Sequence, residues 1–284
     1  MALSTAISAS VLRDVTASGV RLRVAEDGTG PAVVLLHSLF FDHTSWHGVI
    51  KGLRGRFRVV APDLPGFGES EKPPPSRFPY GIEAFAEAIA DLYAGLELGR
   101  AALVGHGLGG AVAVTLAARH PELVARLVLI DTLCYEAELD FYQRVALVPL
   151  VGGFAFKQLW GRSSFRAHFR ETLLSARARV LNERIDHYYR MFNTPAARGS
   201  ALATLRATVD TRSVVAQTSR IQTPTLVVWG RADRVVPAGH GQRLAREIRG
   251  AGFELVDAGH APQEELPAEL SAILTRFLGA GRPS

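Results

Sequence analysis

A glycine-rich stretch at residues 103–110, Leu-Val-Gly-His-Gly-Leu-Gly-Gly, stands between an apolar run and a run of small residues that predicts a helix. Gly105, Gly107 and Gly110 fit the pattern G-x-G-x-x-G, in which a turn after a strand lets a dinucleotide pyrophosphate approach a helix N-terminus. Asp131 ends the next apolar run, where such enzymes hold the ribose with an acid. This interpretation predicts a nicotinamide or flavin oxidoreductase. Against it, the motif follows several earlier strands, whereas the fingerprint usually opens its fold.

A second chemistry is indicated by polar residues that follow two later apolar runs. Asp233 lies in WGRADRVVP and His260 in DAGHAPQEELP, each just past a predicted strand. A carboxylate that holds one imidazole nitrogen makes the other a general base for nucleophilic catalysis. The turn at residues 105–109 then fits G-x-S-x-G, the nucleophile elbow, with Gly107 where the serine should be.

The order of these motifs resembles the α/β-hydrolase fold, and in particular its capped esterases, lactonases and carbon–carbon hydrolases. The stretch VVLLHSLFFDHTSW (33–46) stands where that family carries its oxyanion-hole loop, and DLPGFGES (63–70) matches its next strand-end loop. The matching motifs run from Val33 to Pro267. On this resemblance the G-x-G-x-x-G pattern arises by coincidence from the glycine at 107.

The resemblance also implies roles for particular residues. His260 would be the base, Asp233 would orient it, and the backbone N–H groups of Leu39 and Leu108 would bind an oxyanion. Gly107 would occupy the nucleophile position, and neither a cofactor nor a metal would be needed. The expected ligand is a small hydrophobic ester, lactone or dicarbonyl compound.

Two residues depart from the family's pattern. Ser38 follows the histidine of the oxyanion loop where glycine is usual, a change that we expect to be tolerated, whereas Gly107 removes the nucleophile. Leu108 is not the tryptophan that follows the aspartate of haloalkane dehalogenases, and HSLF is not the H-G-x-P of epoxide hydrolases, so serine is favoured as the lost nucleophile. Aspartate is the alternative, because four tyrosines could activate an epoxide: Tyr135, Tyr142, Tyr188 and Tyr189.

The missing hydroxyl leaves three functions open. The chain is a serine hydrolase whose nucleophile has been removed, as is done to trap a substrate; or an isomerase, cyclase or lyase in which His260 and Asp233 act as a general base; or a binding protein that has kept the pocket. Retention of an acid–histidine pair speaks against the binding protein. Glycine tolerates the strained turn of an elbow, so we expect the fold to survive.

The elements that must position these residues alternate between short apolar runs and helical stretches. Predicted strands lie at 19–28, 32–38, 57–63, 101–107, 124–131, 223–230 and 252–260, and predicted helices at 44–54, 81–97, 108–119, 238–249 and 267–279. This pattern predicts a doubly wound, mostly parallel α/β sheet with sites at the carboxyl ends of its strands. Because residues 132–212 lack a clear strand, we predict an α/β-hydrolase core at 1–131 and 213–284 and a helical cap at 132–212.

Composition narrows the class of protein further. The 284 residues carry a net charge of +5 and one cysteine; the positive excess falls within residues 132–212 and forms no dense basic run, so no nucleic-acid partner is expected. No apolar run is long enough for a membrane span, and the first residues lack the basic flank of a signal peptide. A single cysteine fits a reducing compartment. We expect a cytoplasmic protein that binds a small hydrophobic molecule, with a disordered or partner-seeking start (1–13) and an oligomeric state that the sequence does not define.

Other residues have simpler interpretations. His43 and His47 have the spacing of zinc ligands on a helix, but no third ligand is evident, and we expect ordinary residues at a helix start. His106 precedes the elbow and is expected to pack structurally, and Cys134 is expected to be a core or hinge thiol. Asp131 is the weaker alternative for the orienting acid.

Overall fold

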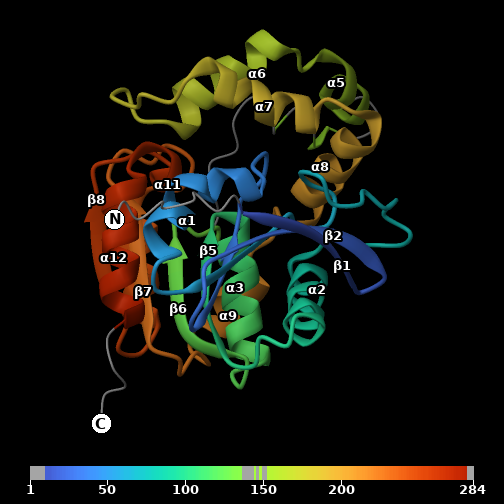
Figure 1. Cartoon of the computed structure of the whole chain (residues 1–284). Helices are drawn as coiled ribbons and strands as arrows, with labels where there is room; N and C mark the ends of the chain where they lie inside the picture. The colour runs from blue at the N-terminus through green and yellow to red at the C-terminus, as the bar shows by residue number, and fades with distance from the viewer. Residues whose placement is uncertain (1–9, 136–143, 145–146, 149–151, 280–284) are drawn as a thin grey trace, which may run out of the picture.

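The computed structural model describes residues 10–135, 144, 147, 148 and 152–279, which form an eight-stranded sheet with helices around it (Figure 1). The strand order is β1-β2-β4-β3-β5-β6-β7-β8. The strands β3 to β8 are parallel, and β1 and β2 pair antiparallel at one edge. The predicted mostly parallel α/β class is therefore confirmed. In chain order the strands are β1 (Val11–Ala17), β2 (Val20–Asp27), β3 (Ala32–Leu36), β4 (Arg58–Pro62), β5 (Ala101–His106), β6 (Val124–Ile130), β7 (Thr225–Gly230) and β8 (Gly252–Val256).

The edge strand β1 corrects the expectation for the start of the chain. Residues from Val11 onward do not form a disordered start but pair with β2, from Val11↔Glu26 to Ala17↔Val20. Most of the β1 side chains are exposed or half-buried, because β1 is the edge strand of the sheet and has a neighbouring strand on one side alone. Residues 1–9 lie outside the described part of the chain.

Helices cover both faces of the sheet. The helices α1 and α12 pack together on one face, and α2 and α3 pack together on the other. Alternate residues of the central strands divide between these faces: Leu103 and Leu127 join the core under α2 and α3, whereas Val104 and Val128 join the core under α1 and α12. Burial on both faces explains why the central strands are continuous apolar runs. The helices are η1 (His43–Trp46), α1 (His47–Leu53), α2 (Ile82–Gly95), α3 (Leu108–Arg119), α5 (Gly152–Leu159), α6 (Arg162–His168), η2 (Phe169–Leu173), α7 (Asn182–Phe192), α8 (Pro195–Ala207), α9 (Arg212–Thr218), α10 (Ala238–Glu247), α11 (Pro262–Glu265) and α12 (Pro267–Gly279).

The helices α5 to α8, called the upper helices below, lie between β6 and β7 in the chain and form a layer above the sheet in Figure 1. Their interior is aromatic, with the Trp160 ring 5.3 Å from that of Phe192 and 5.7 Å from that of Phe165. Phe40, from the loop after β3, inserts among these rings, at 4.9 Å from Trp160 and 5.5 Å from Phe192. The loop after β3 is therefore packed against the upper helices.

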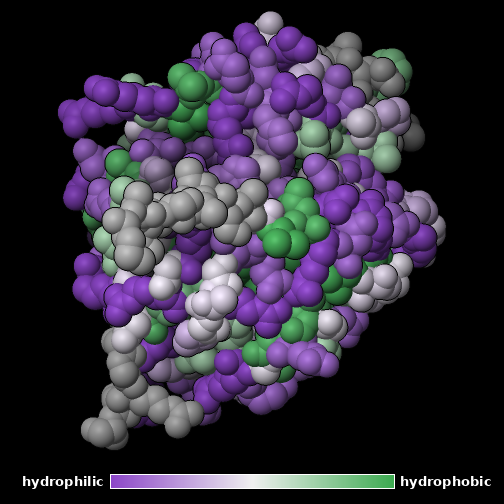
Figure 2. All heavy atoms as spheres, viewed as in Figure 1, coloured by the Kyte–Doolittle hydropathy of each residue, from purple (hydrophilic) through white to green (hydrophobic). Residues whose placement is uncertain are grey.

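Within the described residues no helix is both long enough and apolar enough to cross a bilayer. On the face shown in Figure 2, hydrophobic residues form small separate groups among hydrophilic ones. Isolated apolar residues of this kind are usual on folded proteins.

Candidate active site

The turn between β5 and α3 carries Gly107 in a conformation that few side chains tolerate. Its φ is +52° and its ψ is −111°. Two backbone hydrogen bonds fix it there: Gly107 N–H donates to the Ile130 carbonyl at 3.0 Å, and Leu133 N–H donates to the Gly107 carbonyl at 3.0 Å. Gly109 is required for close approach, because a Cβ there would lie 2.5 Å from the carbonyl oxygen of Leu36. Gly107 and Gly109 therefore allow a tight turn from β5 into α3, packed closely against the end of β3.

His260 and Asp233, predicted as a base and its orienting acid, lie side by side beneath this turn. His260 Nδ1 is 2.8 Å from Asp233 Oδ2, and the other oxygen, Oδ1, accepts N–H bonds from Val235 at 2.7 Å and Val236 at 3.0 Å. Both side chains are buried. Because the carboxylate accepts at Nδ1, the neutral ring carries its proton there and leaves Nε2 free to accept one. A Cβ added at Gly107 would lie 3.3 Å from this Nε2.

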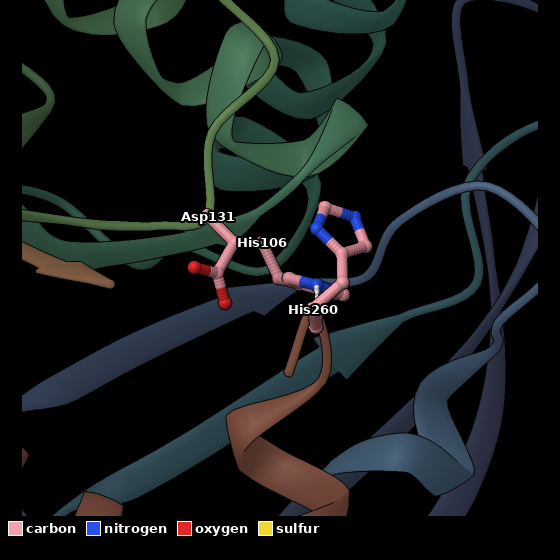
Figure 3. A group of neighbouring side chains, drawn as sticks. All are labelled: His106, Asp131 and His260. Atoms are coloured by element: carbon pink, nitrogen blue, oxygen red, sulfur yellow. Dashed lines mark hydrogen bonds between the residues drawn. The ribbon is translucent and has the colours of Figure 1, made fainter. Parts of the chain in front are cut away.

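His106 fixes the main chain of His260. Its Nε2–H donates to the His260 carbonyl at 2.5 Å (Figure 3). Its Nδ1 accepts from the side-chain amide of Gln263 at 2.9 Å. Burial and then the neighbouring His260 lower the pKa of His106 well below the usual range, so this ring is neutral. His106, Asp131 and His260 lie close enough together to share a metal ion, but both nitrogens of His106 are already bound by protein groups. His106 is thus a positioning residue as well as a packed one.

Asp131, the alternative acid, is buried behind the pair. It follows β6 directly with a φ of +43°, and its Oδ1 accepts the Gly230 N–H at 2.7 Å. Burial and then the charge of Asp233 raise the pKa of Asp131 well above its ordinary value. Burial beside a second carboxyl group therefore favours the protonated form of Asp131. This geometry favours Asp233 as the partner of His260.

A cavity of about 300 Å³ opens at these residues, within the size range of small-molecule sites. The predicted site residues Leu39, Gly107, Leu108 and His260 all line it. The upper helices and the segment after them contribute positions that the sequence did not single out, because neither charge nor motif marks them. The remaining lining residues are mostly apolar: Ser38, Leu133, Tyr135, Leu205, Thr208, Val209, Thr211, Val235 and Val236.

Ser38, expected to be a tolerated departure, is part of this cavity wall. Its Oγ accepts the Leu108 N–H at 3.2 Å, so a predicted oxyanion donor is bound by the Ser38 hydroxyl. A Cβ added at Gly107 would lie 2.1 Å from Ser38 Oγ and 2.8 Å from Ser38 Cβ. The Ser38 side chain therefore fills the space into which a side chain at 107 would project.

A second group of acidic and histidine side chains lies beside the upper helices. Asp63 Oδ1 accepts from the His43 N–H at 2.6 Å and lies 2.9 Å from its Nδ1, and Asp42 Oδ2 is 2.8 Å from His187 Nε2. Asp42, His43 and Asp63 are near enough to share a metal ion, yet their oxygens already accept hydrogen bonds from the protein. His43 and His47 do begin short helices, as predicted. We interpret the group as a structural contact between η1 and α7.

The remaining side chains considered as candidates are buried, hydrogen-bonded or packed against other rings, or lie outside the described residues. Cys134 is fully buried, and burial raises the pKa of its thiol. Tyr135 lines the cavity and donates to Glu247 at 2.6 Å, while the Tyr188 hydroxyl donates to Glu264. Tyr189 packs edge-on against an aromatic ring of the upper helices. Tyr142 lies outside the described part of the chain.

The sheet, the elbow-like turn and the acid–histidine pair together define an α/β-hydrolase type of protein. A family model described as alpha/beta hydrolase fold matches residues 31–267. The chain therefore belongs to the α/β-hydrolase fold family, and the dinucleotide-binding alternative for residues 103–110 is dropped.

Several relatives cover most of the chain. It is 32% identical over 286 residues to an uncharacterized protein of Mycobacterium tuberculosis, spanning 95% of this chain and 81% of that protein. It is 29% identical over 283 residues to the 2-hydroxymuconate semialdehyde hydrolase of a Pseudomonas species, spanning 95% of each. The crystal structure of the enol-lactonase from Burkholderia xenovorans matches 94% of this chain and 100% of that one, with a TM-score of 0.80 and 25% identity. The hydrolases among these relatives are named for small-molecule substrates.

Proposed function

We propose that the chain hydrolyses a small hydrophobic carbonyl compound, an ester, lactone or dicarbonyl, with His260 as general base. The observation that carries this proposal is the orientation of His260: Asp233 holds Nδ1 at 2.8 Å, and Nε2 faces the cavity at Gly107. A base oriented in this way has no use in a protein that only binds its ligand. Relatives named as a semialdehyde hydrolase and an enol-lactonase support the substrate class.

Gly107 occupies the nucleophile position in this proposal, so no acyl group can be carried at that residue. His260 Nε2 instead takes the proton of an attacking O–H group, and Asp233 stabilises the imidazolium that results. The negative charge that develops on the carbonyl oxygen is bound by the backbone N–H groups of Leu39 and Leu108. His260 then returns its proton to the leaving oxygen or carbon.

The walls of the cavity set the substrate class. Leu133, Leu205, Val209 and Val235 are apolar, and no Lys or Arg is among the described lining residues. An uncharged, hydrophobic acyl or enol group fits such a wall better than a highly charged one. Residues 132–212, the proposed cap, supply Leu205 and Val209 and so part of the specificity.

A second candidate rests on the same base. An isomerase, cyclase or lyase needs a proton acceptor and donors for an enolate oxygen but no nucleophile, and Gly107 offers none. It predicts proton exchange at carbon rather than release of an acid. Deuterium incorporation from heavy water into a dicarbonyl compound, without hydrolysis, is its signature.

The experiment is hydrolysis of a panel of short-chain nitrophenyl esters, enol lactones and vinylogous dicarbonyl compounds by the unaltered chain. We expect His260→Gln to reduce turnover by about 10²–10⁴-fold, the usual contribution of a general base. His120→Gln is the matched control, since His120 is half-buried beside Glu87 and Glu122 and does not line the cavity. Ligand binding that is unaffected by His260→Gln, with no turnover of any compound, would instead identify a binding protein.

A further inference from the structure

The Ser38 hydroxyl is the atom that lies nearest to the point a side chain at residue 107 would occupy. We propose that Ser38 supplies the nucleophile that the elbow lacks, so that the acyl group is carried on the loop after β3. This inference rests on the proposed function, because it names the O–H group from which His260 takes a proton.

The register of two neighbouring strands places Ser38 beside Gly107. The strands β3 and β5 are parallel neighbours, and Leu36 pairs with Gly105. Two residues further along each chain, Ser38 and Gly107 leave the sheet side by side at its carboxyl edge. Ser38 Oγ then lies 2.1 Å from the point that a Cβ of residue 107 would occupy, and His260 Nε2 lies 3.3 Å from the same point. The hydroxyl and the base therefore border one small volume.

The backbone of Ser38 is held so that its side chain alone can move. The Ser38 carbonyl accepts the Phe41 N–H at 3.2 Å and lies 2.8 Å from His37 Nδ1. The Leu64 N–H donates to His37 Nε2 at 2.9 Å, so the proton of this neutral ring is on Nδ1 and is donated to Ser38. With the carbonyl bound twice, rotation about the Cα–Cβ bond is the movement left to Oγ, and the proposal requires that this rotation carry Oγ from Leu108 N–H to His260 Nε2.

The surroundings of Ser38 Oγ favour negative charge on oxygen. The side chain lines the apolar cavity but is only 5% exposed, so bulk water does not compete strongly for it. Leu108 N–H, which contacts Oγ at 3.2 Å, is the first N–H of the helix α3, where the peptide dipoles present partial positive charge. Such a donor stabilises an alkoxide as well as the tetrahedral oxyanion.

The reaction then follows two balanced steps. His260 Nε2 takes the Ser38 hydroxyl proton while Oγ attacks the carbonyl carbon, and collapse of the tetrahedral intermediate expels the leaving group, which receives that proton. The product is an ester on Ser38. Water attacks this ester while His260 takes a water proton; the acid departs, and the proton returns to Ser38 Oγ.

The test combines turnover with covalent labelling. A fluorophosphonate forms a P–O bond to the oxygen of an activated serine and releases fluoride. The mass of the intact protein reports the adduct. Trypsin separates the two positions, because residue 38 falls on peptide 24–51 and residue 107 on peptide 101–119. The adduct within 24–51 is assigned by fragmentation to Ser38 or to Ser45. Ser45→Ala is the matched control, since it removes a buried hydroxyl that donates to the Asp42 carbonyl outside the cavity.

We expect label on Ser38 of the unaltered chain, and a loss of at least 10²-fold in both labelling rate and turnover in Ser38→Ala but not in Ser45→Ala. Ser38→Gly combined with Gly107→Ser should move the label to peptide 101–119, because one hydroxyl then returns to the elbow. Turnover that survives Ser38→Ala but is lost in His260→Gln would overturn the inference and leave the proposed function standing. Label on Ser38 without turnover of the panel would support the nucleophile and refute the substrate class. Neither label nor turnover would refute both.

Discussion

Restoring a serine at residue 107 is expected to destabilise the protein unless Ser38 is removed at the same time. A side chain at the φ and ψ of Gly107 costs about 1–3 kcal/mol in backbone strain. The new Cβ would also lie 2.1 Å from Ser38 Oγ and 2.8 Å from Ser38 Cβ, so the Ser38 side chain must move. Overpacking of this kind costs about 1–3 kcal/mol, and the lost Ser38–Leu108 hydrogen bond adds about 0.5–1.5 kcal/mol.

Urea unfolding of the unaltered chain, Gly107→Ser, Ser38→Gly and the double variant separates these contributions. The double variant keeps the backbone strain but not the overlap, so it should be more stable than the sum of the single changes by about 1–3 kcal/mol. Gly99→Ser is the matched control, since Gly99 also has a positive φ, +59°, with no atom within 4 Å of an added Cβ. The coupling free energy between Gly99→Ser and Ser38→Gly should be close to zero. A coupling free energy below about 0.5 kcal/mol at Gly107 would refute the overlap on which this reasoning depends.

Further predictions concern the buried ionisable groups. Asp233→Asn should reduce turnover by about 10⁴-fold, as in other acid–histidine pairs, whereas Asp131→Asn should change it less than about 10-fold. Because burial and Asp233 raise the pKa of Asp131, its ionisation opposes folding as pH rises above about 3.9, and thermal unfolding of Asp131→Asn at neutral pH should show an equal or higher Tm. Burial lowers the pKa of His43, but Asp63 raises it on balance, so the pair stabilises the fold fully below about pH 6.5 and less as pH rises through the folded pKa. The free energy of unfolding of His43→Gln, measured in urea, should therefore fall less above that pH than the free energy of unfolding of the unaltered chain. An equal fall in both proteins would contradict the pairing. Cys134 should not react with a thiol reagent until guanidinium unfolds the chain, and rapid labelling of the native protein would contradict its burial.

The parts of the site that the sequence predicts are those marked by local context. Asp233 lies three residues past the end of β7 and His260 four residues past the end of β8. Because parallel strands bring their carboxyl ends to one edge, the two residues could be placed together without knowing the strand order. The helices at 108–119 and 267–279 were likewise predicted with their observed bounds, because their small and apolar residues begin directly after a turn or a proline.

Ser38 illustrates what could not be predicted. Its importance depends on β3 lying next to β5, with Leu36 opposite Gly105, and neither the strand order nor the register is marked in the local sequence. The cavity residues Leu205 and Val209 are similar: each looks like an ordinary core residue. The placement of α8, for Leu205, and of the segment after it, for Val209, decides that they face the site. Strand β1 was missed because its side chains are mostly not buried.

The position of Phe40 links admission of a ligand to the chemistry. Phe40 follows Leu39 directly, has a φ of +67°, and packs among Trp160, Phe165 and Phe192 of the upper helices. A movement of these helices that let a ligand enter would pull on Phe40 and so turn the neighbouring Leu39 N–H. We expect a ligand that fits closely beneath the helices to hold this proposed oxyanion donor in place, and a bulkier one to displace it. Poorly fitting substrates should therefore show their penalty in kcat as well as in KM, a selectivity exercised through the rate of reaction and not through affinity alone.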